Sequence, residues 1–133
     1  RMAADQGHAG AQYNLGNIYD NGQGVAQDYS AAMKWFRMAA DQGDAGAQYN
    51  LGAMYRQGQG VAKDDSEAIK WCRKAAEQGL AQAQCNLGIM YYKGQGMVQS
   101  NNNALRWLYK SANQGFKDAK SAINKIIADK KAN

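Results

Sequence analysis

One segment of 36 residues occurs three times in the sequence without gaps. Residues 43–78 match residues 7–42 at 24 of 36 positions and residues 79–114 at 17 of 36 positions. Agreement at a fixed step indicates duplication, and periods of about 20–50 residues are typical of repeat arrays. We therefore predict an all-α solenoid in which three copies of one unit pack on their neighbours, in a single domain over residues 1–133.

Alanines and glycines divide each unit into two helices. The chain has 15 glycines and no proline, and alanine, the strongest helix former, is common between the glycines. In the first unit Leu15, Ile18 and Tyr19 share one helical face. First helices are predicted over residues 9–21, 45–57 and 81–93. Second helices are predicted to begin near the N-cap residues Asp28, Asp64 and Ser100 and to end at Gly43, Gly79 and Gly115.

Two repeated residues inside the helices indicate how they pack. Glycine recurs in the middle of the first helices, as Gly16, Gly52 and Gly88, although it costs about 1 kcal/mol of helix propensity there. We therefore predict that a neighbouring helix approaches closely at this position. Tryptophan recurs in the second helices in register with alanines, which favours packing over base stacking. Trp71, in the middle unit, is expected to be buried between helix pairs.

The two ends of the chain differ from the middle. Residues 1–7 repeat residues 37–43, so the chain is expected to begin inside a unit, with residues 1–6 as the tail of an upstream repeat. After Gly115 the pattern decays and lysines accumulate, which predicts a capping helix over residues 117–131 with a polar outer face. A homodimer formed through exposed terminal helices is left open.

The repeated residues resemble those of the Sel-one-like repeat family, which is related to the tetratricopeptide repeat. The resemblance covers residues 1–116 and rests on Ala47, Gln48, Leu51, Gly52, Tyr55, Gly58, Gly60, Val61, Ala68, Trp71, Ala75, Ala76 and Gly79. It implies a right-handed superhelix of antiparallel helix pairs, with the first helices along the concave side. It also implies an adaptor that holds another protein or peptide, of a kind frequent in bacteria and often exported or periplasmic.

The resemblance also supplies candidate binding residues on the concave side. They are Tyr13, Asn14, Asn17, Asp20, Tyr49, Asn50, Arg56, Asn86, Tyr92 and Lys93. The asparagines at 14, 50 and 86 recur in every unit, and their carboxamides either bond groups of the fold or grip a ligand backbone. Arg56 and Lys93 favour an acidic side chain or a C-terminal carboxylate. A ligand's negative end is therefore expected to point toward the third repeat.

No catalytic or metal-binding pattern stands out in the sequence. His8 is the only histidine, and the serines at 30 and 66 precede their lysines by four residues, one too many for a Ser-x-x-Lys motif. We expect a non-enzymatic scaffold without cofactor or metal. The alternative is an envelope-associated penicillin-binding hydrolase, as ascribed to the cysteine-rich relatives. Their disulfides cannot be carried over, because Cys72 and Cys85 do not recur; two thiols are favoured over a bridge.

Charge is distributed unevenly along the chain. Residues 1–67 carry five basic and eight acidic residues, whereas residues 68–133 carry eleven and three, giving the net charge of +5. The basic half either forms a solvated, lysine-rich surface or attracts an acidic surface of a partner. No clustered basic stripe with interleaved aromatics is apparent, so no nucleic acid is expected. Membrane insertion is not expected either, because no run of 18 apolar residues occurs.

Overall fold

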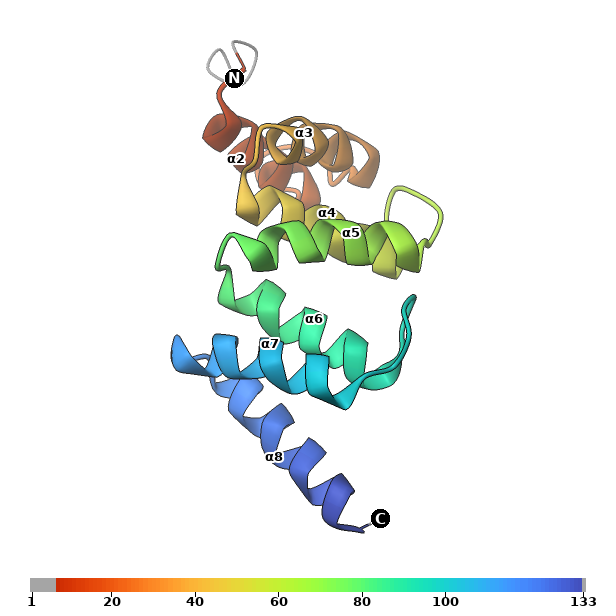
Figure 1. The fold of residues 1–133 in the computed structure, drawn as a ribbon. Helices are drawn as coiled ribbons and strands as arrows, with labels where there is room; N and C mark the ends of the chain where they lie inside the picture. The colour runs from red at the N-terminus through yellow and green to blue at the C-terminus, as the bar shows by residue number, and fades with distance from the viewer. Residues whose placement is uncertain (1–6, 133) are drawn as a thin grey trace.

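The computed structural model describes residues 7–132, and the regular structure of this part is entirely helical. The expected tail over residues 1–6 lies outside the described residues. The helices are α2 (Ala9–Asn21), α3 (Tyr29–Asp41), α4 (Ala45–Gln57), α5 (Asp65–Glu77), α6 (Ala81–Lys93), α7 (Asn101–Asn113) and α8 (Lys117–Ala132). They stack in chain order, so that α2 and α8 lie at opposite ends of an elongated solenoid (Figure 1). The predicted fold class is confirmed.

Local capping signals explain the observed helix bounds. The side chains of Asp28, Asp64 and Ser100 each accept a hydrogen bond from the backbone N–H three residues ahead, at 3.0, 3.1 and 3.1 Å. These are the three predicted N-caps. The first helices end at glycines in the left-handed conformation, with φ near +70°, which residues with a Cβ rarely adopt. The three first helices therefore occupy the predicted residues.

The glycine in the middle of each first helix lies against its partner helix. A Cβ atom at Gly52 would lie 3.0 Å from the carbonyl oxygen of Ala68, and one at Gly88 would lie 2.9 Å from that of Ala104. Those oxygens belong to the backbones of α5 and α7, which cannot move aside as a side chain can. The predicted close approach is confirmed, and it occurs within each helix pair.

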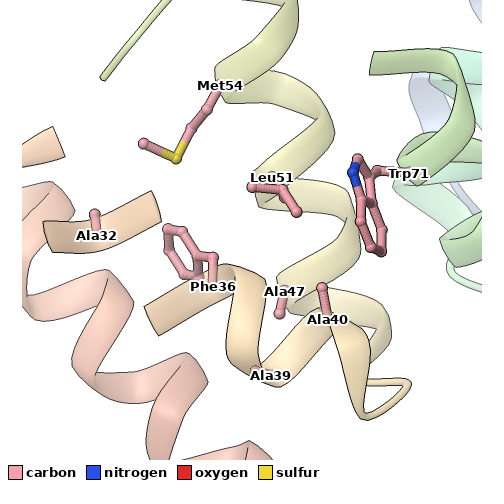
Figure 2. Close-up of a cluster of buried hydrophobic side chains, with 8 residues drawn as sticks. All are labelled: Ala32, Phe36, Ala39, Ala40, Ala47, Leu51, Met54 and Trp71. Carbon is pink, nitrogen blue, oxygen red and sulfur yellow. The ribbon is translucent and has the colours of Figure 1, made fainter. Parts of the chain in front are cut away.

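Trp71 joins the second helix pair to the first. It projects from α5 toward Leu51 and Ala40, whereas Phe36 of α3 faces the other side of the same cluster (Figure 2). Only 3% of its surface is exposed, as predicted, although its indole N–H has no hydrogen-bond partner. The apolar contact between these two units therefore combines Trp71 with Phe36, Leu51, Met54 and several alanines.

A buried glutamine in α4 and another in α6 form a second contact between units. In α4, Gln48 donates from Nε2 to the carbonyl oxygen of Ala40 at 3.2 Å. Its Oε1 accepts from Nε2 of Gln78 at 2.8 Å, and Gln78 also donates to the carbonyl oxygen of Gly43. The third unit repeats all three bonds with Gln84, Gln114, Ala76 and Gly79. We call this set the glutamine ladder; Gln12 accepts the equivalent bond from Gln42 at 2.7 Å.

Helix α8 packs on the third helix pair. Ala119, Ile123 and Ile126 of α8 are buried in a cluster with Leu108 of α7 and Cys85 of α6. The five lysines of α8, at positions 117, 120, 125, 130 and 131, are exposed. The predicted capping helix with a polar outer face is therefore present.

Replacing Trp71 by alanine should lower the free energy of unfolding by about 3–5 kcal/mol, because it empties a buried ring site that the surrounding alanines cannot fill. Urea melts monitored by circular dichroism would measure the loss. A loss under about 1 kcal/mol would contradict the observed burial.

Replacing Gln48 by leucine should cost about 1–2 kcal/mol, because two hydrogen bonds of the glutamine ladder are lost while side-chain volume is nearly kept. Gln82→Leu on the exposed side of α6 is the matched control and should change stability by less than about 0.5 kcal/mol. Equal effects of the two substitutions would show that the ladder does not stabilise the stack.

Candidate functional site

Hydrogen bonds between predicted site residues link the first helices α2, α4 and α6 along one surface. Asn50 of α4 donates from Nδ2 to Oδ1 of Asn17 in α2 at 3.3 Å. Asn86 of α6 donates from Nδ2 to the hydroxyl of Tyr49 in α4 at 3.2 Å. We call this surface, from Asn17 to Lys93, the first-helix face. The structure thus brings together four of the predicted residues in two pairs.

The recurring asparagines differ in their surroundings. Asn14 is exposed, whereas Asn50 and Asn86 are half-buried and each donates one N–H to the preceding unit. A carboxamide has two N–H donors and one acceptor oxygen, so each of these bonds uses only part of its capacity. The contacts hold the side chains across the face in a fixed orientation.

Two tyrosines of the site contribute to packing as well as to the surface. Tyr13 is half-buried, its ring centroid lies 5.9 Å from that of Phe36, and its ring edge lies where Gly46 lacks a side chain. The hydroxyl of Tyr49 accepts from Asn86, as described above. Their rings therefore form rigid walls rather than mobile contacts.

The charged residues of the first-helix face have no ion-pair partners. Within residues 7–132 the ion pairs are Arg37–Asp41 and Lys70–Glu67, so Arg56 and Lys93 lack a carboxylate partner. Arg56 is half-buried and borders a shallow hollow with Tyr49, Asn86 and Cys72. An unpaired cation in a partly buried position favours a nearby anion.

Asp20 occupies in α2 the position that Arg56 has in α4. It is half-buried, and burial raises the pKa of its carboxyl above the usual range. The side chain at this position changes from carboxylate to guanidinium over one step of 36 residues. The first-helix face therefore carries an acidic side chain in its first unit and a basic one at the equivalent position of its second unit.

The third unit places its site residues against α8. The hydroxyl of Tyr92 donates to Oδ2 of Asp129, and this bond raises the pKa of Tyr92. Lys93 is exposed beside a cavity that also touches Lys125. Sequence reasoning missed both α8 residues, because similarity decays after Gly115. One more step of 36 residues from the site positions Ile89 and Lys93 leads to Lys125 and Asp129.

Both cysteines are buried thiols and no disulfide joins them. Cys72 Sγ donates to the carbonyl oxygen of Ala83 at 3.3 Å. Burial raises the pKa of Cys72 to about 11, although Arg56 and Arg73 act in the opposite direction, and burial raises that of Cys85 as well. The predicted thiols are confirmed, and neither has the low pKa of a nucleophile.

The second helices carry cations over their tryptophan rings, a basic stripe that sequence reasoning did not find. Arg37, Lys70 and Lys74 lie 5.3, 5.1 and 5.8 Å from the ring centre of Trp71. Lys34 and Lys110 lie similarly over Trp35 and Trp107. These cations come from neighbouring turns of the second helices, and because the second helices of successive units stack, the cations follow one another along the surface. Because Trp71 is 3% exposed beneath its cations, its ring cannot stack on a base.

Other kinds of site were sought in the described residues. No cluster of three or more histidine, cysteine or acidic side chains suited to a metal ion occurs among residues 7–132. No helix of that part is long and apolar enough to cross a membrane. A wide groove between α7 and α8 exposes Tyr109 and Ile127. The homodimer through exposed terminal helices stays an open prediction.

The family model for the Sel1 repeat matches residues 9–44, 45–80 and 81–116. The chain belongs to the Sel1 repeat family. Members of this family generally mediate protein–protein interaction and are typically non-enzymatic scaffolds. No curated protein sequence matches the chain.

Solved structures of other Sel1 repeat proteins are similar to this one. A protective antigen of uropathogenic Escherichia coli strains is 46% identical with a TM-score of 0.84, over 85% of this chain and 24% of the antigen. A Sel1 repeat protein from Oxalobacter formigenes is 40% identical with a TM-score of 0.83, over 86% of this chain and 45% of that one. The chain thus spans less than half the length of either protein. Cysteine-rich protein B of Helicobacter pylori, 22% identical with a TM-score of 0.72, covering 91% and 92% of the two chains, shares the fold.

In the folded protein, Cys72 should react slowly with an aromatic disulfide reagent at pH 8.5. A pKa raised to about 11 keeps the thiol protonated at that pH, and the thiolate is the reactive form. The reaction should accelerate as the pH approaches 11 or when urea unfolds the chain. Absorbance of the released thiolate measures it in a Cys85→Ser variant. Reaction of the folded protein at the rate of a free thiol would contradict the burial of Cys72.

Proposed function

We propose that the chain is a non-enzymatic adaptor that holds an extended or helical segment of a partner protein along its first-helix face. The observation that carries this proposal is that Arg56 and Lys93 have no carboxylate partner within residues 7–132, on a face where Asn50 and Asn86 are held in place. A solenoid of short units presents such a face as an extended concave surface.

The amide groups supply contacts that do not depend on the partner's sequence. Asn50 and Asn86 are oriented by their bonds to Asn17 and Tyr49, so less side-chain entropy is lost when a ligand binds. Their remaining donors and acceptors match the N–H and C=O groups of a peptide backbone. The rigid tyrosine rings add contact area at low entropic cost.

The charges give the bound segment a direction. Asp20 lies in the first unit, Arg56 in the second and Lys93 in the third. A partner segment with acidic groups toward one end would place that end over the second and third units, where carboxylates meet unpaired cations.

The buried thiols argue against the hydrolase alternative. A thiol nucleophile would require a lowered pKa and access to solvent, whereas both cysteines are buried with raised pKa values. Ser30 and Ser66 lie on the exposed surface of second helices, with no base bonded to them among the described contacts. These observations support a binding role.

Reversing Arg56 to glutamate should weaken peptide binding at least about tenfold, because one charge-assisted contact becomes a repulsion. Peptides would first be selected from a displayed library on the wild-type chain and then titrated by fluorescence anisotropy. Arg106→Glu is the matched control: Arg106 is an exposed arginine of α7, and reversing it should leave binding unchanged.

Replacing Asn50 by alanine in the same experiment separates binding from folding. A ligand-binding amide predicts weaker binding with a loss of stability below about 1 kcal/mol, since the bond to Asn17 is only half-buried and long at 3.3 Å. If Asn50→Ala instead lowers stability and Arg56→Glu leaves binding intact, the asparagines are structural and the partner binds elsewhere.

A further inference from the structure

The first-helix face ends in a pocket between α6 and α8. The pocket has a volume of about 180 Å³ and is lined by Ile89, Tyr92, Lys93, Ala122, Lys125 and Ile126. Three of these residues lie on α6 and three on α8, which lies beside α6 at the lower end of the stack in Figure 1. None of the α8 residues belongs to the predicted binding site.

The pocket arises from a change in the repeated sequence. Asn14, Asn50 and Asn86 follow one another at 36-residue steps, and the next step leads to Ala122. A methyl group therefore stands where the other first helices have a carboxamide. Ile89 likewise occupies the position of Asn17. At the α8 end of the first-helix face, the asparagine side chains are therefore replaced by apolar side chains that surround an open space.

The volume suits one apolar side chain. A cavity of about 150 Å³ lined by leucine, isoleucine and phenylalanine side chains accommodates benzene, so a pocket of 180 Å³ accepts a group of leucine or phenylalanine size. Ile89, Ala122 and Ile126 provide the apolar lining, and the ring of Tyr92 is held by the bond of its hydroxyl to Asp129.

The electrostatics of the pocket favour an anion beside that side chain. Lys93 and Lys125 both line the pocket and are both exposed, and neither forms an ion pair within residues 7–132. The acid of α8 nearest to Lys125 in the sequence, Asp129, is bonded to Tyr92. Two ammonium groups beside an apolar space match a ligand that carries a carboxylate next to an apolar side chain.

We propose that this pocket binds the C-terminal residue of the partner, an apolar residue such as leucine whose α-carboxylate lies between Lys93 and Lys125. The inference rests on the proposed function, because it places the negative end of the segment held on the first-helix face. A chain terminus fits better than an internal residue, since only a terminus carries a carboxylate and an apolar side chain on the same Cα atom.

The test uses a short fluorescein-labelled peptide, Gly-Ser-Gly-Ser-Leu, on the whole chain. Anisotropy titrations would compare the free acid, the C-terminal amide and a variant ending in serine. We expect the free acid to bind at least about tenfold more tightly than either, since each comparison removes one of the two recognised groups. An amide that binds as tightly as the acid overturns the proposal, as does a free acid without measurable binding.

Variants of the chain locate the site. Lys93→Met and Lys125→Met should each weaken binding of the free acid about fivefold and leave binding of the amide unchanged. Lys120→Met is the matched control, because Lys120 of α8 lines the groove against α7 instead. Ala122→Phe should fill the pocket and abolish the preference for leucine. If Lys120→Met weakens binding as much as Lys125→Met does, net charge alone attracts the peptide and the proposal fails.

These experiments distinguish failure of the pocket proposal from failure of the proposed function. Library peptides that require Arg56 but show no preference for a free C-terminal carboxylate would overturn the pocket and leave the first-helix face intact. Conversely, binding of the leucine acid that depends on Lys125 but not on Arg56 would confirm the pocket and remove the support for the longer groove.

Discussion

Each helix pair is joined to the preceding one by a buried amide. Gln48 and Gln84 donate to carbonyl oxygens in the last turn of the preceding second helix, and they accept from Gln78 and Gln114 at the end of their own pair. The carbonyl oxygens of Ala40 and Ala76 also accept from the backbone N–H groups of Gly43 and Gly79, so each glutamine amide adds a second hydrogen bond, from the neighbouring unit. The ladder therefore fixes the register between units, while the alanines and Trp71 around it provide apolar contact. That register brings Asn50 to Asn17 and Asn86 to Tyr49.

Most of the fold is predictable because its signals are local. The N-caps Asp28, Asp64 and Ser100 and the glycines after each first helix are visible in the sequence, and they set the helix bounds that the structure has. The burial of Trp71 follows from its register with alanines. The glutamine ladder is different: Gln48 recurs visibly, but glutamine is usually exposed, and its partner Gln78 lies 30 residues away. Only the stacked units show why it recurs.

The site was predictable as far as the repeat is regular. The periodic alignment placed Asn17, Tyr49, Asn50 and Asn86 on one side of the first helices, and the structure joins Asn50 to Asn17 and Asn86 to Tyr49. It failed at the C-terminal end, where α8 contributes Lys125 and Asp129 without resembling the earlier units. Tyr92 illustrates the difference: the alignment places it on the concave side, and the structure adds a hydrogen bond from its hydroxyl to Asp129 of α8. The first-helix face thus continues onto α8, where apolar side chains and lysines take the place of the asparagine amides.

The proposed function places a partner on the first-helix face. The most direct test is a map of backbone amide shifts in the ¹⁵N-labelled chain while a library-selected peptide is added. The account predicts shifts in α4, α6 and α8, grouped around Asn50, Asn86 and Lys125, with little change around Lys34, Lys70 and Arg106 on the second helices. Shifts concentrated on α3, α5 and α7 would contradict it and would place the partner over the cations and tryptophans of the opposite surface.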